Sequence, residues 1–185
     1  MKEEVFQEAR EDMEKTLDAL RHEFGRVRTG RASLTLLDGI RVDYYGTPTP
    51  LNQMASLSIP ESRLIVIQPW DNKAIGDIEK AILKSDLGLT PVSDGKLIRI
   101  NIPNLTEERR KELVKLTKKT SEDYKVRLRN IRRQSNEILK ELKKEKEISE
   151  DDMFKYQKEI QEMTDKFAER VEEELKKKEN EIFEV

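Results

Sequence analysis

The chain has 185 residues, and 40 % of them are charged, but 36 basic and 38 acidic side chains leave a formal net charge of only −2. This balance excludes a global attraction to nucleic acid or to an anionic membrane, so any contact with nucleic acid has to come from a local patch. Cysteine is absent, which excludes disulfides, thiolate zinc sites and a cysteine nucleophile. We expect a cytoplasmic protein, because the charged N-terminus does not resemble a signal peptide and no apolar run approaches the ~20 residues of a membrane span.

Glycine and proline are confined to the middle of the chain. All seven glycines lie between Gly25 and Gly95, and all six prolines lie between Pro48 and Pro103. Both residues are disfavoured inside helices and favoured in turns, so the flanks should be helical and the middle rich in strands and turns. We therefore predict a helical domain from residues 1–29 and 106–185, and a small domain inserted at residues 30–105.

The N-terminal flank has apolar residues at intervals of three and four. This spacing predicts one amphipathic helix, which we expect Gly30 to end. The stripe consists of Phe6, Ala9, Met13, Leu17, Leu20, Phe24 and Val27.

The insert alternates strand and helix patterns. Residues 40–44 and 64–67 read as strands, and residues 97–102 as a third strand after the Asp94-Gly95 turn. Between them, a helix should begin at Asp71-Asn72 and end at Leu87–Leu89. These patterns predict a small β/α/β domain.

Three aromatic residues of the insert, Tyr44, Tyr45 and Trp70, have the chemistry of platforms on which nucleic-acid bases stack. A small domain with few aromatic residues needs them for its core, so we favour core packing.

From Thr106 onward the helical pattern resumes in two long stretches. Thr106 is a candidate N-cap for the first, and Ser149 with Asp152 forms a capping box for the second. The first stripe comprises Leu113, Leu116, Thr120, Tyr124, Leu128, Ile131, Ser135, Ile138 and Leu142; the second comprises Met153, Tyr156, Ile160, Met163, Phe167, Val171, Leu175 and Ile182.

Helices with a single apolar stripe cannot bury that face alone. The simplest arrangement is a long antiparallel three-helix bundle, interrupted after its first helix by the insert, which makes the fold class α+β. An intermolecular coiled coil would use the same stripes. Short turns favour the intramolecular bundle.

The first of these two long stretches contains a local charge imbalance. Between Tyr124 and Asn136 there are five basic residues and no acidic one. At about 100° per residue, Lys125, Arg129, Arg132 and Arg133 fall along one side of a helix, where they can meet an RNA phosphate backbone. A solvated face whose long stems cover the bundle edge would show the same pattern.

We find no arrangement of residues for catalysis. His22, the single histidine, follows the pattern of a surface residue, and the glycines form neither a Walker nor a dinucleotide loop. We expect no bound metal and no cofactor.

Five sequence blocks together resemble the ribosome recycling factor family, in the order and over the length typical of that family. They are Arg28–Ser33, Val42–Leu51, Ser85–Leu89, Leu105–Arg110 and Arg129–Arg133. The resemblance implies an L-shaped, monomeric protein. It also implies an activity: with elongation factor G, which carries the GTP, such a factor splits the ribosome into subunits after termination.

The resemblance further implies that Arg28, Arg31, Arg129 and Arg132 face RNA of the large ribosomal subunit. Together with the residues of the basic window, the expected RNA-binding set is Arg28, Arg31, Lys125, Arg129, Arg132 and Arg133. Two segments connect the insert to the helices, and the expected hinge residues are Thr29, Gly30, Pro103, Asn104 and Leu105.

Two other function classes fit parts of the pattern. A helical adaptor or chaperone cofactor would use its apolar stripes to bind other proteins and would oligomerise. A hydrolase acting on ribosome-bound peptidyl-tRNA would need a nucleophile or base that we do not find.

Overall fold

A computed structural model of the protein describes residues 2–184, which divide into two compact units. The helical unit combines the chain up to Phe24 with Lys111–Asn180. The small unit contains Gly25–Arg110 and the residues from Glu181 onward.

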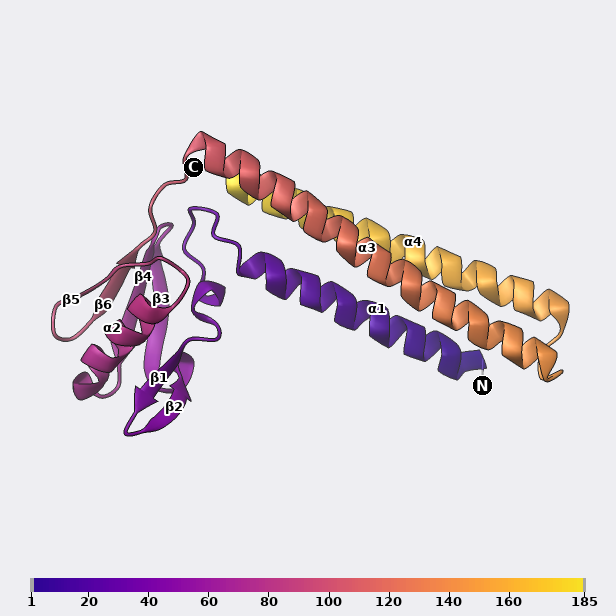
Figure 1. The fold of residues 1–185 in the computed structure, drawn as a ribbon, viewed down its shortest axis with the longest axis horizontal. Helices are drawn as coiled ribbons and strands as arrows, with labels where there is room; N and C mark the ends of the chain where they lie inside the picture. Colours follow the sequence, from indigo (N-terminus) through magenta and orange to yellow (C-terminus); the bar gives the residue numbers. More distant parts are fainter. Residues whose placement is uncertain (1, 185) are drawn as a thin grey trace. The chain divides into compact units, whose positions relative to one another are not determined.

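Three long helices make up the helical unit: α1 (Lys2–Gly25), α3 (Glu107–Lys144) and α4 (Glu150–Phe183). They lie side by side, with α3 antiparallel to both α1 and α4 (Figure 1). The predicted antiparallel three-helix bundle, interrupted after its first helix, is confirmed.

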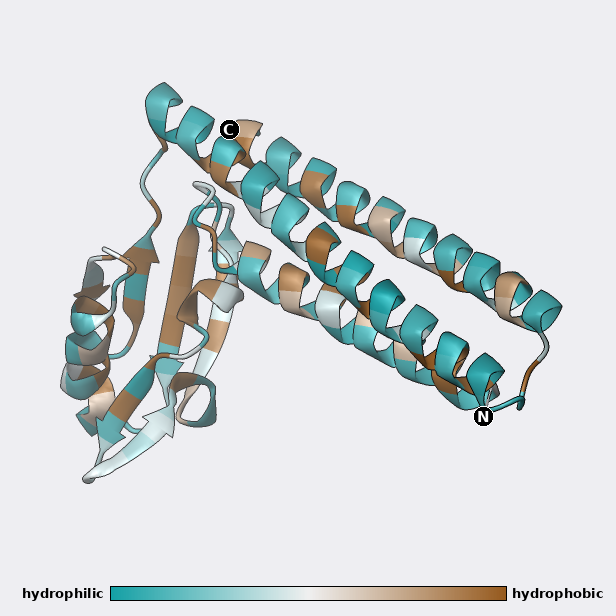
Figure 2. Ribbon diagram, turned by 45° about the vertical axis from the view of Figure 1, so that its right-hand side comes forward, coloured by the Kyte–Doolittle hydropathy of each residue, from teal (hydrophilic) through white to brown (hydrophobic). Residues whose placement is uncertain are grey.

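The apolar stripes of the three helices face one another and form the core of the bundle, where the hydrophobic positions gather on the inner faces (Figure 2). Met13, Leu17 and Leu20 of α1 have no exposed surface. They pack with Leu128 of α3 and Val171 of α4 in one cluster. Burying such side chains stabilises a fold by about 1.5 to 3 kcal/mol each, so this contact holds α1 in place.

The buried face of α3 differs in part from the predicted stripe. Leu116 and Ile138 are 50 % and 40 % exposed, whereas Thr117, outside the predicted stripe, is buried, as is Ser135, which belongs to the stripe. Each of these two hydroxyls donates a 3.0 Å hydrogen bond to a carbonyl oxygen three or four residues earlier. Because this satisfies the hydroxyl within the helix, a residue such as Thr117 can enter the core at a position that the apolar pattern does not predict.

An ion pair joins α1 to α4. Two nitrogens of the Arg170 guanidinium donate to the two Glu14 carboxylate oxygens at 2.8 and 2.7 Å. These hydrogen bonds lower the pKa of Glu14. The same guanidinium lies 5.0 Å from the centre of the Phe167 ring, a cation–π contact on the same helix.

Both predicted helix starts are confirmed by their capping bonds. The Arg109 backbone N–H donates to the Thr106 hydroxyl at 3.2 Å. The Asp152 N–H donates to the Ser149 hydroxyl at 3.0 Å, and the Ser149 N–H donates back to the Asp152 carboxylate at 3.3 Å. Helices α3 and α4 therefore begin where their local sequence specifies.

The first helix ends earlier than predicted, at Gly25 and not at Gly30. The Gly25 carbonyl oxygen accepts a 2.7 Å hydrogen bond from the Thr35 hydroxyl, and a Cβ atom at Gly25 would lie only 3.1 Å from that hydroxyl. This tertiary contact ends the helix, so Val27 is not part of the α1 stripe. Arg28 consequently lies in the segment that follows the helix.

The small unit contains six strands within the described residues, arranged as a two-stranded sheet and a four-stranded sheet of order β3-β4-β6-β5, all antiparallel. Helix α2 follows a short 3₁₀ turn capped by Asp71, as predicted, but ends at Lys84, before Leu87–Leu89. The elements are β1 (Arg41–Tyr44), β2 (Thr47–Pro50), β3 (Ala55–Glu61), β4 (Leu64–Pro69), α2 (Ile75–Lys84), β5 (Pro91–Ser93) and β6 (Ile98–Asn101).

The core of the small unit is aliphatic. Paired residues of the two central strands, Ile65 opposite Ile100 and Ile67 opposite Ile98, have no exposed surface, and neither has Ile78 of α2. The three predicted strands correspond to β1, β4 and β6. Strands β2 and β5 were missed because they have only four and three residues and contain proline, and β3 was missed although its residues 55–59 alternate between apolar and serine.

Two of the three aromatic residues of the insert do not pack in this core. Tyr45 is 78 % exposed in the turn after β1, and Trp70 is 69 % exposed at the end of β4. Tyr44 does pack against the core, and its hydroxyl donates to Asp71 at 3.2 Å. Core packing was therefore the wrong prediction for Tyr45 and Trp70, because isoleucine and leucine side chains already fill the interior.

The exposure of Trp70 can be tested by substitution. We expect Trp70→Ala to change the free energy of unfolding by less than about 1 kcal/mol, because little surface is buried. The matched core variant Ile78→Ala should lose about 2 to 5 kcal/mol. Chemical denaturation followed by far-UV circular dichroism measures both, and a loss above about 2 kcal/mol for Trp70→Ala would show that the indole contributes to the core.

Candidate nucleic-acid interface

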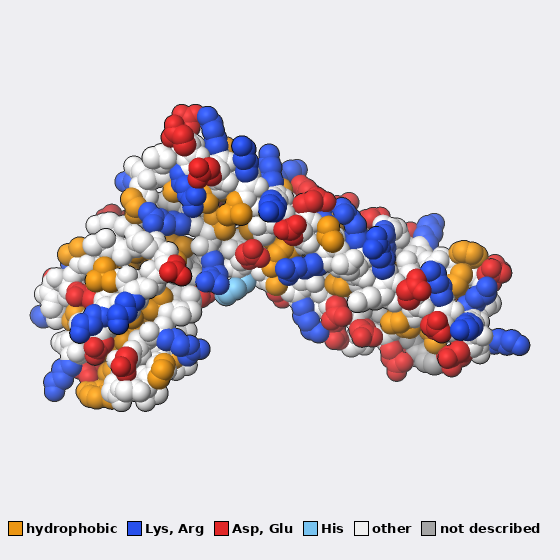
Figure 3. Space-filling view, in the orientation of Figure 1, with side chains coloured by type: hydrophobic (Ala, Val, Ile, Leu, Met, Phe, Trp, Pro, Cys, Tyr) orange, Lys and Arg blue, Asp and Glu red, His pale blue; other side chains and the backbone are white. Residues whose placement is uncertain are grey.

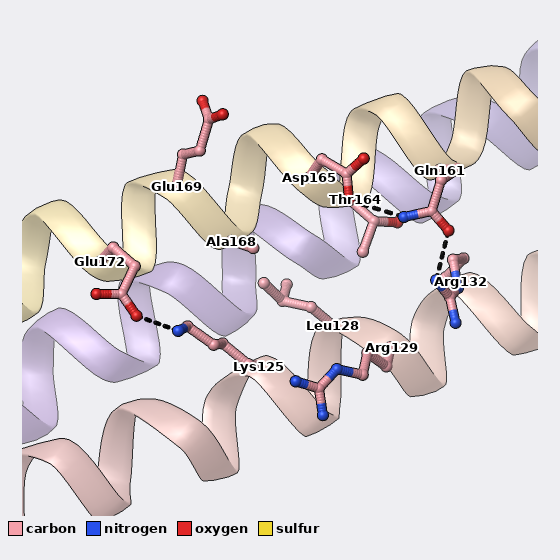
Figure 4. A pocket seen from close by; sticks show the side chains of 10 residues that line it. All are labelled: Lys125, Leu128, Arg129, Arg132, Gln161, Thr164, Asp165, Ala168, Glu169 and Glu172. Atoms are coloured by element: carbon pink, nitrogen blue, oxygen red, sulfur yellow. Dashed lines mark hydrogen bonds and ion pairs between the residues drawn. The ribbon is translucent and has the colours of Figure 1, made fainter.

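The basic window of the sequence lies on α3 and faces α4 across a groove of about 480 Å³ (Figure 4). Three of its cations, Lys125, Arg129 and Arg132, line the α3 side. The α4 side carries Asp165, Glu169 and Glu172 together with Gln161. The remaining lining residues are Leu128, Thr164 and Ala168.

Lys125 is neutralised across the groove. Its ammonium group pairs with the Glu172 carboxylate, and the Glu122 carboxylate lies 3.8 Å away on the same helix. The side chain is only 19 % exposed. Lys125 therefore closes one end of the groove. It would have to break its ion pair with Glu172 before it could bind an anionic ligand.

Arg129 is paired along α3. Its Nη2 atom lies 2.9 Å from a carboxylate oxygen of Glu122, and both side chains are about half exposed. Exposed pairs of this kind contribute about 0.2 to 1 kcal/mol, so a phosphate can displace Glu122 at little cost.

Arg132 differs from the other two cations. It is half-buried, and its Nη1 atom donates to the side-chain oxygen of Gln161, which is uncharged. The guanidinium is thus held by α4 while its positive charge remains.

The other two cations of the window lie outside the groove lining. Arg133 is exposed to solvent. Arg127 lies 4.2 Å from the centre of the Tyr124 ring, a cation–π contact. Burial, together with the hydrogen bond from its hydroxyl to Glu23, raises the pKa of Tyr124. This tyrosine therefore connects α3 to α1.

Sequence reasoning found the α3 side of the groove and missed the α4 side. Gln161, Asp165, Glu169 and Glu172 recur at intervals of three and four, which places them on one face of α4. That periodicity is visible in the sequence, but nothing in it indicates that this face meets the basic window. In Figure 3, basic and acidic side chains intermingle along the helices, and no continuous basic field appears on the visible face.

The two remaining arginines of the predicted RNA-binding set belong to the small unit. The Arg28 guanidinium donates to the Leu87 carbonyl oxygen at 3.1 Å and is half-buried. Arg31 is exposed, and its Nη1 atom lies 3.2 Å from the Glu184 carboxylate. The predicted cations therefore form two groups, with four in the helical unit and two in the small unit.

The predicted hinge residues lie in two segments without regular structure. Gly30 has a φ of +81°, a conformation that favours glycine, and a Cβ atom there would lie 3.6 Å from the Leu105 side chain. The two segments are thus adjacent at Gly30 and Leu105. Thr29 is buried, whereas Pro103 and Asn104 are exposed.

Other kinds of site are not apparent in residues 2–184. No group of three or more histidine, aspartate or glutamate side chains is placed to hold a metal ion in this range. His22 is exposed, as predicted. No helix of the described range has the length and apolar character needed to cross a membrane.

Known proteins resemble this chain over its whole length. The family model for the ribosome recycling factor matches residues 20–183. The ribosome-recycling factor of Syntrophobacter fumaroxidans is 60 % identical over 182 residues, which cover 98 % of each chain. That of Syntrophus aciditrophicus is also 60 % identical, over 185 residues and 100 % of each chain.

Solved structures agree with this assignment. A solution structure of a ribosome recycling factor, 42 % identical, covers 100 % of this chain and 98 % of its own, with a TM-score of 0.80. A second is described as models for the T. thermophilus ribosome recycling factor and the E. coli elongation factor G bound to the E. coli post-termination complex. It is 44 % identical, covers all of both chains and has a TM-score of 0.69. Sequence and fold together establish that the chain belongs to the ribosome recycling factor family.

Proposed function

We propose that this protein binds the post-termination ribosome and, together with elongation factor G and GTP, splits it into subunits, which frees the mRNA and tRNA. Family membership supports this proposal, since ribosome recycling factors are non-enzymatic translation factors. So does the related recycling factor that is described with elongation factor G on a post-termination complex. The energy would come from GTP hydrolysis on elongation factor G, and this chain would act in the cytoplasm as a monomer.

The proposed binding surface for the large subunit is the groove face of α3. The observation that carries this part of the proposal is Arg132, a half-buried cation whose hydrogen-bond partner Gln161 is neutral. A guanidinium held in this way can bind an RNA phosphate without first breaking an ion pair. Arg129 and the exposed Arg133 would extend the contact along the helix, and Lys125 would join it only by exchanging its Glu172 partner for a phosphate.

Arg28 and Arg31 would form a second part of the RNA contact, in the small unit. Arg28 is held by the Leu87 carbonyl oxygen, which like Gln161 leaves the charge of the guanidinium in place. Arg31 would exchange its exposed Glu184 partner for a phosphate. RNA of the large subunit is thus the proposed binding partner for both groups of cations.

The proposed hinge consists of the two connecting segments, with residues Thr29, Gly30, Pro103, Asn104 and Leu105. Neither segment has helix or strand hydrogen bonds, so rotation there breaks no secondary structure. Rotation would let the small unit take a push from elongation factor G while the helical unit remains bound.

Sedimentation tests the function directly. The protein is mixed with post-termination ribosomes, elongation factor G and GTP, and we expect free subunits that do not form when the chain is omitted or a non-hydrolysable GTP analogue is used. A helical adaptor would bind ribosomes but release no subunits with GTP. That result would contradict the proposal.

The substitution Arg132→Gln tests the proposed contact with RNA. A charge-assisted hydrogen bond contributes about 1.5 to 3 kcal/mol, so affinity for isolated large subunits should fall by roughly 10- to 100-fold. The slope of log affinity against log salt concentration should become shallower by about one. Arg127→Gln, which removes the same charge from the same helix outside the groove, is the control. An unchanged dissociation constant for Arg132→Gln at matched salt would exclude the contact.

A reversible crosslink tests the hinge. Because the chain has no cysteine, two introduced cysteines, one in residues 31–102 and one in residues 107–180, are its only thiols. We expect the oxidised protein to bind ribosomes but not to split them, and reduction to restore splitting. Undiminished splitting by the fully crosslinked protein would rule out hinge motion.

A further inference from the structure

Three side chains across the α3–α4 groove form a continuous hydrogen-bonded series. The Gln161 side-chain nitrogen donates to the Asp165 carboxylate at 2.7 Å, and the Gln161 side-chain oxygen accepts from Arg132 (Figure 4). Asp165 and Gln161 are one helical turn apart on α4, whereas Arg132 comes from α3.

The orientation of the Gln161 amide follows from its two neighbours. An ionised carboxylate can only accept hydrogen bonds and a guanidinium can only donate them. The amide nitrogen therefore has to face Asp165 and the oxygen has to face Arg132, since the reversed amide would lose both bonds. Asp165 thus determines that Gln161 presents an acceptor to the arginine.

The neutrality of Gln161 separates Arg132 from the other groove cations. Lys125 and Arg129 are paired with carboxylates, which hold the side chains but cancel their charge. An amide holds the guanidinium in place and leaves its charge intact. Arginine carries five N–H donors, and only one nitrogen, Nη1, is occupied by Gln161.

We propose that Gln161, oriented by Asp165, is a positioning residue that presents the Arg132 guanidinium to an anionic partner, an RNA phosphate. The inference rests on the proposed function, because it assumes that Arg132 contacts RNA. It adds that α4, which brings no cation to the groove, decides how well the contact forms. Holding the guanidinium in advance reduces the side-chain entropy lost on binding.

Two substitutions separate the two properties of Gln161. Gln161→Leu keeps the approximate volume but removes the acceptor, so affinity for large subunits should fall by about two- to tenfold, the net effect of one hydrogen bond. Gln161→Glu keeps the acceptor but adds a charge that pairs with Arg132. Its salt slope should therefore become shallower by about one, as for Arg132→Gln.

A double-mutant cycle shows whether Gln161 acts through Arg132. In the Arg132→Gln background, Gln161→Leu should have no further effect on the dissociation constant. Asp165→Ala should weaken binding in the same direction and should have no effect once Gln161 is leucine. Gln157→Leu, on the same helix one turn earlier and outside the groove lining, is the matched control.

The outcomes distinguish the two proposals. If Arg132→Gln weakens binding but Gln161→Leu and Asp165→Ala do not, the positioning role is wrong and the RNA contact stands. An equal loss from Gln161→Leu in both backgrounds also overturns positioning, since the residue then acts independently. If Arg132→Gln itself has no effect, both proposals fail. Thermal unfolding of each variant shows that the fold is retained, and Asp165→Ala, at an exposed position, provides the readout if a Gln161 variant unfolds.

Discussion

Burial of the apolar stripe of α1 is the interaction on which the rest of the structure depends. Met13, Leu17 and Leu20 are fully buried against α3 and α4, although the whole small unit separates α1 from α3 in the sequence. Most of the stability of an amphipathic helix in a protein comes from packing its apolar face, and this applies to the 24 residues of α1. The chain therefore has to leave the bundle after Gly25 and return at Glu107, and its two connecting segments come together at Gly30 and Leu105.

On the surface of this bundle, many cations are paired with carboxylates of the same chain. Glu14 pairs with Arg170, Glu122 with Arg129, and Glu172 with Lys125, so many cations of the helices are neutralised by the chain itself. Against this background, a cation held by a neutral group is distinctive. Arg132 is held in this way by the Gln161 amide, and the proposed binding of RNA depends on this arrangement.

Patterns with strong periodicity predicted structure well, and weak ones did not. The long helices, their caps at Thr106 and Ser149, and the strands with alternating isoleucines were all predictable, because each follows from interactions between near neighbours in the sequence. Strands β2 and β5 are short, contain proline and polar residues, and form only because a partner strand lies beside them. Trp70 is exposed for a related reason, since aliphatic residues from several elements had already filled the core.

By itself, the sequence determined the interrupted bundle, the small α+β insert, the basic window and the resemblance to ribosome recycling factors. Only the tertiary structure decided that α1 ends at Gly25 and which cations of the window keep their charge. The partners of Lys125 and Arg132 lie 47 and 29 residues away along the chain. Helix periodicity specifies the face on which a residue lies, but the register between two packed helices follows from the whole core. That register places Gln161 opposite Arg132 and a glutamate opposite Lys125.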